Sequence, residues 1–227
     1  MTVLEALRTT GAAFSKSLGW SISTALAGAI LSFIGGMLMV ALTHVIFHAE
    51  AFEGIMNWAI ALPALVAQAA FLVIVSQVVA CGNLDNFGVM QWRGVGVLTV
   101  IIIAVAFAAP HLPRPLLFFV PLALSAVLTW TPLVPALAVG PVWWSPSRFI
   151  AAVVASLPFF FLAEMFGLPL QATTFFAGLG FMEGGAVIWP TFGAIYGIHL
   201  WLVTATAAIV PTVVYLYPPQ NSATVSV

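Results

Sequence analysis

Apolar residues along the chain form long continuous runs, separated by short segments in which Pro, Gly, Asn, Trp and the few charged residues gather. The longest runs exceed the roughly twenty residues that an α-helix needs to cross a bilayer. Lipid offers the backbone no hydrogen-bond partner, so only helices or closed barrels can span it. A barrel would show segments of about ten residues with alternating polarity, and the runs do not alternate. The pattern therefore predicts an all-α, polytopic helical bundle in a membrane.

The runs predict seven transmembrane helices. Five are expected at 20–45, 55–80, 95–109, 116–139 and 148–166, with prolines interrupting the fourth and kinking the fifth. The last run, 170–217, is too long for one crossing and fits two helices of about twenty residues each. We expect the chain to reverse between them at Trp189-Pro190-Thr191. The alternative is a broken or re-entrant element there, which gives six transmembrane helices.

The ends of the chain differ from this single transmembrane domain, which covers 20–217. Apolar residues recur at helical spacing in 1–19, with Arg8 and Lys16 among the polar positions. This pattern is typical of a short amphipathic helix lying at the membrane interface. The polar segment 218–227 is expected to be a flexible tail.

The basic residues predict the orientation. With a cytoplasmic N-terminus, four of the five basic residues lie inside, and the positive-inside rule favours this arrangement. The four are Arg8, Lys16, Arg93 and Arg148, and only Arg114 lies outside. We expect the chain in a bacterial inner (plasma) membrane.

Composition excludes several functions. Hydrophobic residues make up 63% of the chain and charged residues 5%, whereas a soluble domain has about 25% charged residues. Five scattered basic residues form no patch for nucleic acid. The single cysteine, Cys81, excludes an internal disulfide and a cysteine-ligated metal centre. We expect no cofactor and no enzymatic activity, and the bilayer as the first partner.

Glu183 and His199 are the most informative polar residues in the apolar runs, because ionisable groups in lipid are costly and usually functional. A reversal at Pro190 places them at similar depth, about 10 and 13 Å from the turn. Tyr196 precedes His199 by three residues and shares its helix face. An apolar setting favours a protonated carboxyl group, with which a neighbouring imidazole can exchange a proton. The residues predict a proton-coupling group. The alternative is structural: Glu183 bonds to the backbone and His199 donates to a carbonyl.

Small residues support the same predicted hairpin. Gly180 and Gly184 on one helix, and Gly193 and Gly197 on the next, have the spacing that lets two membrane helices approach closely.

Two further polar residues are candidates for a solute or proton pathway. Glu164 is expected at the outer end of the fifth span, where it reaches headgroups or water. Gln68 lies near the middle of the second span, where an amide needs a partner across a helix interface. It either lines a solute path or holds two helices together.

His44 and His48 are spaced so that both imidazoles share one helix face, which suits one metal ion bound from one side. The alternative is a pair of interfacial histidines. A redox subunit that uses these residues, or His111 near the same surface, is a third functional hypothesis.

Two hypotheses stand ahead of it. The first is a small-solute or ion transporter, or the membrane component of a transport system, proton-coupled through Glu183, Tyr196 and His199. Glycine-rich and proline-broken helices supply the irregular backbone that transport sites use. The second is a non-catalytic membrane subunit that buries its apolar faces against partner helices. Partners are therefore a small molecule or ion, and either further copies of the chain or other membrane subunits.

Overall fold

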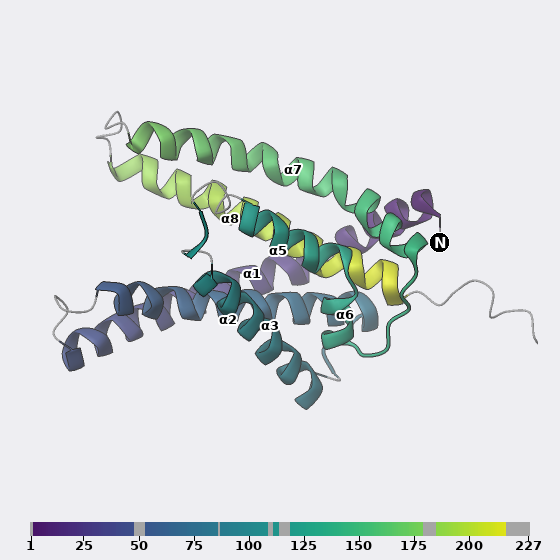
Figure 1. Cartoon of the computed structure of the whole chain (residues 1–227), viewed down its shortest axis with the longest axis horizontal. Helices are drawn as coiled ribbons and strands as arrows, with labels where there is room; N and C mark the ends of the chain where they lie inside the picture. The colour runs from purple at the N-terminus through teal and green to yellow at the C-terminus, as the bar shows by residue number, and fades with distance from the viewer. Residues whose placement is uncertain are drawn as a thin grey trace, which may run out of the picture.

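The computed structural model describes residues 2–47, 53–85, 87–108, 111–113, 119–178 and 185–216; within these ranges the side chains of 32, 39–40, 43–47, 53–60, 121, 166–178 and 185–197 are not described. All the secondary-structure elements among the described residues are helices, which confirms the all-α prediction. The helices are α1 (Val3–Phe47), α2 (Glu53–Cys81), α3 (Val89–Ala108), α5 (Phe119–Trp130), α6 (Leu133–Ala138), α7 (Pro146–Gly178) and α8 (Gly185–Leu216). Figure 1 shows α1, α2, α7 and α8 along the long axis, with α3 crossing obliquely.

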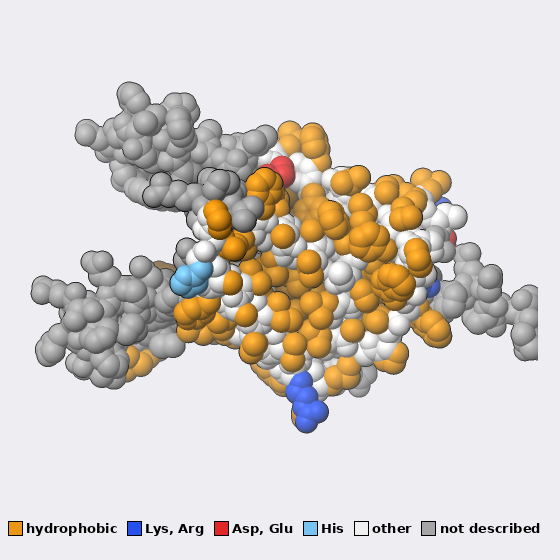
Figure 2. Space-filling view, in the orientation of Figure 1, with side chains coloured by type: hydrophobic (Ala, Val, Ile, Leu, Met, Phe, Trp, Pro, Cys, Tyr) orange, Lys and Arg blue, Asp and Glu red, His pale blue; other side chains and the backbone are white. Residues whose placement is uncertain are grey.

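Five of these helices contain segments long and apolar enough to cross a membrane, so the predicted count of seven is not confirmed. The segments are Val3–Leu38, Ala61–Cys81, Val89–Ala108, Pro146–Met165 and Ile198–Leu216. Hydrophobic side chains cover most of the face seen in Figure 2, and the few charged ones lie towards its edges. The chain is therefore an integral membrane protein.

The reversal predicted at Trp189-Pro190-Thr191 is wrong. Helix α8 begins at Gly185 and is helical through Pro190, while α7 extends to Gly178. The run from 170 onward is thus shared between the end of α7 and the whole of α8. A proline inside a membrane helix is tolerated because neighbouring groups can satisfy the freed carbonyl, so Pro190 did not mark a turn.

The fourth predicted span is broken, as its prolines indicated. Helix α5 ends at Trp130, and the six-residue α6 follows with Pro132 at its N-cap. Twelve residues of α5 extend about 18 Å, well short of the hydrocarbon thickness. Two contacts hold its end in place: the Trp130 carbonyl accepts a hydrogen bond from the Tyr215 hydroxyl, and Trp130 Nε1 donates to Ser156 Oγ at 3.0 Å.

The segment expected to form a separate interfacial helix is continuous with the first span. Helix α1 runs from Val3 to Phe47, and Thr2 and Glu5 cap its start by bonding each other's backbone N–H. Its first turns pack on the bundle, because Ala6 is fully buried against α7 and α8.

Two regular pairings set the helix directions around α8. Helices α7 and α8 are antiparallel. Arg148 contacts Val214, and fifteen residues later in α7 Ala163 contacts His199, which lies fifteen residues earlier in α8. Helices α2 and α8 are parallel, because Gln68 pairs with Thr204 and Ser76 with Thr212, eight residues on in both helices. Nearly every residue from 202 to 215 is buried, so α8 is the central helix of the bundle.

The start of α1 and the end of α8 lie at the same end of the bundle, where Ala6 packs with Ala151 and Val214 (Figure 1). Helices α2 and α5 also end there, and α7 begins there. We call this the basic end, because Arg8, Lys16 and Arg148 lie at or near these helix ends, and Arg93 lies in the first turns of α3, which follows the end of α2 after a short connection. The chain therefore enters and leaves the described bundle on one side.

Candidate functional site

The turn at Pro190 that was expected to bring the proposed proton-coupling group together is absent, because α8 is helical through that residue. His199 lies fourteen residues, or about 21 Å, along α8 from Gly185, so a turn at Pro190 no longer sets its depth. Glu183, Gly180 and Gly184 lie outside the described residues. Tyr196, Gly193 and Gly197 lie on α8, but what surrounds them is not described. The argument that matched the depths of Glu183 and His199 therefore loses its basis.

His199 is held by the neighbouring helix. Its Nδ1 lies 2.9 Å from the Ala163 carbonyl on α7. A carbonyl oxygen can only accept, so Nδ1 carries a proton, and in the neutral ring Nε2 is left as an acceptor. This is the contact that the structural alternative predicted, in which His199 donates a hydrogen bond to a backbone carbonyl. The same hydrogen bond fixes the orientation of the imidazole ring.

Glu164 follows Ala163 and is partly exposed. The prediction placed it at the outer end of a span, but α7 continues to Gly178, about 21 Å further on. Glu164 is the penultimate residue of the apolar segment Pro146–Met165, although the helix itself continues beyond that segment.

Gln68 lies beside a cavity of about 250 Å³ between α1, α2 and α8. Its Nε2 donates to Thr204 Oγ1 at 3.5 Å, and that hydroxyl donates in turn to the Leu200 carbonyl at 2.7 Å. Thr24 and Trp201 also line the cavity. Both predicted roles of Gln68 meet here, because the amide bridges two helices and faces an open space.

Small residues create this space. Gly28 on α1 and Ala64 and Ala67 on α2 line the cavity, and a Cβ at Gly28 would lie 3.5 Å from the Ala67 Cβ. The backbones of α1 and α2 thus approach closely, as small residues allow in membranes. Large side chains at these positions would close the cavity.

Two polar atoms belong to side chains that line the cavity, and one of them lacks a partner among the described residues. Trp201 Nε1 is buried and makes no hydrogen bond. Gln68 uses its Nε2, which leaves Oε1 as an acceptor. A buried donor without a partner costs about 1–3 kcal/mol, whereas Gln68 is partly exposed and lines the cavity, where a polar molecule can reach it.

A second polar pair extends from the cavity toward the basic end. The Ser76 and Thr212 hydroxyls bond across the α2–α8 interface, about 12 Å along the helices from Gln68 and Thr204. Thr212 also donates to the Ala208 carbonyl. The α2–α8 interface thus carries polar groups at two depths inside an otherwise apolar core.

Thr204, Trp201 and the polar face of α1 were not among the site residues predicted from the sequence. Small and hydroxyl residues recur on α1 every three, four or seven residues, and the structure turns them inward: Thr10, Ser17, Ser21, Thr24 and Gly28. The outward positions carry large apolar side chains such as Leu26 and Phe33. This spacing was a usable signal, because small inward and large outward residues mark a helix that faces lipid on one side.

The metal hypothesis is not supported by described residues. In the part of the chain whose side chains are described, no three His, Cys, Asp or Glu residues gather as a metal site. The His44 side chain and all of His48 lie outside that part. The metal pair stays a prediction.

Comparison with known protein families, characterised proteins and solved structures gives no match for this chain. The fold and its spans define the class of protein: a polytopic α-helical integral membrane protein.

Proposed function

We propose that the chain is a permease for small neutral solutes, or the membrane component of a transport system. The observation that carries this proposal is the cavity beside Gln68, Trp201 and Thr204, located within three long apolar helices. Solute sites in membrane carriers are formed by a few polar groups inside such bundles.

The chemistry of the lining favours a neutral solute. Every lining side chain is uncharged, and the polar ones are Thr24, Gln68, Trp201 and Thr204. An ion without a counter-charge would lose its hydration and gain no charged partner, which is strongly unfavourable in an apolar interior. A molecule that donates to the Gln68 amide oxygen or to the Thr204 hydroxyl suits the polar side chains of the lining.

Osmotic swelling of proteoliposomes tests the proposal. Vesicles containing the purified chain are mixed with urea or glycerol, and light scattering follows the swelling rate. We expect faster swelling than in protein-free vesicles. We expect Gln68→Leu to abolish most of the increase, because it removes the amide while keeping a side chain that lipid tolerates.

Gln77→Leu is the matched control. Gln77 lies on the same helix, is buried, and contacts Cys81 and not the cavity. Vesicles with Gln77→Leu should swell as fast as vesicles with the unmodified chain. Circular dichroism should show the same helix content in Gln68→Leu and Gln77→Leu. Equal swelling with and without protein for every solute would contradict the proposal and favour a non-catalytic subunit that purifies with fixed partners.

Proton coupling through Glu183 and His199 stays a prediction of the sequence. The contact between His199 Nδ1 and the Ala163 carbonyl fits the structural alternative, and it is compatible with proton coupling because Nε2 is left as an acceptor. Solute exchange driven by a pH gradient should be lost in Glu183→Gln while passive swelling continues. Unchanged pH-driven exchange in that variant would remove Glu183 from the mechanism.

A further inference from the structure

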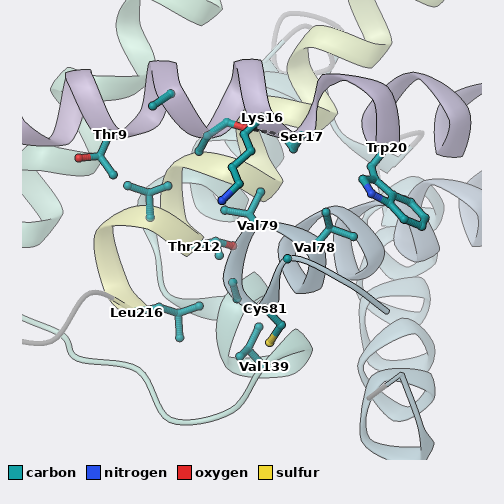
Figure 3. A pocket seen from close by; sticks show the side chains of 15 residues that line it. Thr9, Lys16, Ser17, Trp20, Val78, Val79, Cys81, Val139, Thr212 and Leu216 are labelled. Carbon is teal, nitrogen blue, oxygen red and sulfur yellow. Dashed lines mark hydrogen bonds between the residues drawn. The ribbon is translucent and has the colours of Figure 1, made fainter. Parts of the chain in front are cut away.

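A second, larger cavity opens at the basic end, away from the site near Gln68. It is a groove of about 790 Å³ between α1, the last turns of α2 and α8, and Val139. Its apolar wall includes Val79, Val213 and Leu216, and its polar positions include Thr9, Lys16 and Ser17. Figure 3 shows these side chains around the opening.

Lys16 gives the groove its charge. It is the only lysine of the chain, and its amine points from α1 into the groove in Figure 3. No Asp or Glu lines the groove. Among the described residues no hydrogen bond or ion pair is found for this ammonium, and the side chain is exposed. Among the described residues, the site therefore offers one positive charge without a partner beside an apolar wall.

The position in the bilayer identifies the anion that this charge meets. Trp20 lies at the groove and is 45% exposed, as expected of an aromatic residue at a membrane interface. The same end carries Arg8, Arg93 and Arg148, which the positive-inside rule assigns to the cytoplasmic face. The leaflet at that face holds the anionic lipids. A free phosphate would use the ammonium but not the apolar wall.

We propose that this groove binds an anionic phospholipid, with its phosphate at the Lys16 ammonium and an acyl chain against Val79, Val213 and Leu216. Thr9 and Ser17, also on α1, line the same groove. This site does not depend on the proposed solute permeability.

Cys81 supplies a reporter, since it is the only cysteine, is exposed, and lines the groove. The full chain is reconstituted in nanodiscs of phosphatidylcholine with or without phosphatidylglycerol, and neutral N-ethylmaleimide is added. We expect phosphatidylglycerol to slow the modification of Cys81. Lys16→Gln should weaken this protection about fivefold, the effect of one basic residue near an anionic surface, and Lys16→Arg should retain it.

Arg8→Gln is the matched control, because it removes the same charge from the same helix outside the groove. It should leave the protection in place. Native mass spectrometry of the released protein should show phosphatidylglycerol retained by the unmodified chain and by Arg8→Gln, but not by Lys16→Gln. The same loss in Arg8→Gln and Lys16→Gln would overturn the proposal in favour of general surface charge. Unchanged retention of phosphatidylglycerol by Lys16→Gln would also overturn the proposal, even if that variant were less stable. The Lys16 ammonium would then only stabilise the C-terminal carbonyl groups of α2 and α8.

Discussion

The Ser76 and Thr212 hydroxyls form a hydrogen bond across two parallel helices, and the Gln68–Thr204 pair repeats this relationship eight residues earlier. Because lipid tails are as apolar as leucine, burial of apolar surface does not select one lateral arrangement of helices over another. Polar pairs at matching depth fix how far α2 is displaced along α8. They therefore determine where the cavity beside Gln68 and the groove beside Lys16 lie.

Removing one partner of the Ser76 pair should destabilise the bundle slightly. Ser76→Ala leaves Thr212 bonded to the Ala208 carbonyl, so we expect a loss of about 0.6 kcal/mol, the average for such bonds in a membrane protein. A double-mutant cycle with Thr212→Val, measured by unfolding in mixed micelles, isolates the pairwise energy. Thr99→Val is the control, since the Thr99 hydroxyl has no hydrogen-bond partner in the part of the chain that the structure describes. An equal loss in that variant would refute the pair.

Arg148 should contribute more to stability than the other basic residues. It is buried at the start of α7, and its guanidinium donates to the Val214 carbonyl at 2.8 Å, near the end of α8. Arg148→Leu should lower the free energy of unfolding by about 1.5–3 kcal/mol, the range for hydrogen bonds to charged groups. Arg93→Leu, at an exposed position, should change it by less than about 0.5 kcal/mol. Similar melting temperatures of the two variants in detergent would contradict this assignment.

Two glycines on α3 should respond in opposite ways to alanine. A Cβ at Gly94 would lie far inside van der Waals contact with the Leu137 carbonyl oxygen, so Gly94→Ala must push α3 from α6, at about 1–3 kcal/mol. Nothing lies within 4 Å of a Cβ at Gly96. Gly96→Ala should therefore be neutral or stabilise α3 by up to about 1 kcal/mol. Thermal unfolding of the two variants checks the contrast, and equal effects would show that α3 and α6 do not touch at Gly94.

The two sides of the bundle should be distinguishable by cysteine labelling. Cys81 and a cysteine at Leu216 end α2 and α8 at the basic end, whereas Leu112 follows α3. In inside-out vesicles a membrane-impermeant maleimide should label Cys81 and, in a Cys81→Ser background, Leu216→Cys. Leu112→Cys should react only from the other side.

That expectation follows because α8 runs parallel to α2, so both helices end on the same side of the bundle. With seven crossings, Leu216→Cys would react from the side opposite to Cys81. That result would contradict the single passage of α8 through the bundle.

The membrane class, the second span and the proline break after Trp130 were predictable because each depends on local properties of the chain. The span expected at 55–80 agrees with α2 (Glu53–Cys81). The continuation of α8 through Pro190 was not predictable, because a proline ends a helix in water but can lie within one in lipid. No charged residue separates the apolar residues on either side of it, so hydropathy gave no boundary.

The candidate site shows the same division. Gln68 was identified from its own polarity, but Thr204 and Trp201 are hydroxyl and indole groups of ordinary kinds on a helix 136 residues away. Their importance arises only when α2 and α8 lie parallel, and no pattern within either helix reports that alignment. Likewise, in the sequence Lys16 indicated only the orientation in the membrane. It became a candidate for lipid binding because the tertiary structure places it beside the ends of α2 and α8.

The sequence by itself determined that the chain is a membrane protein, that it is helical, and which helix ends carry the positive charge. These follow from the transfer free energy and backbone hydrogen bonding of each segment taken alone. The tertiary structure decided which helices are neighbours, where α7 gives way to α8, and where a cavity and a groove remain. In lipid those choices depend on the fit of small residues and the pairing of polar groups between distant segments, which no single segment contains.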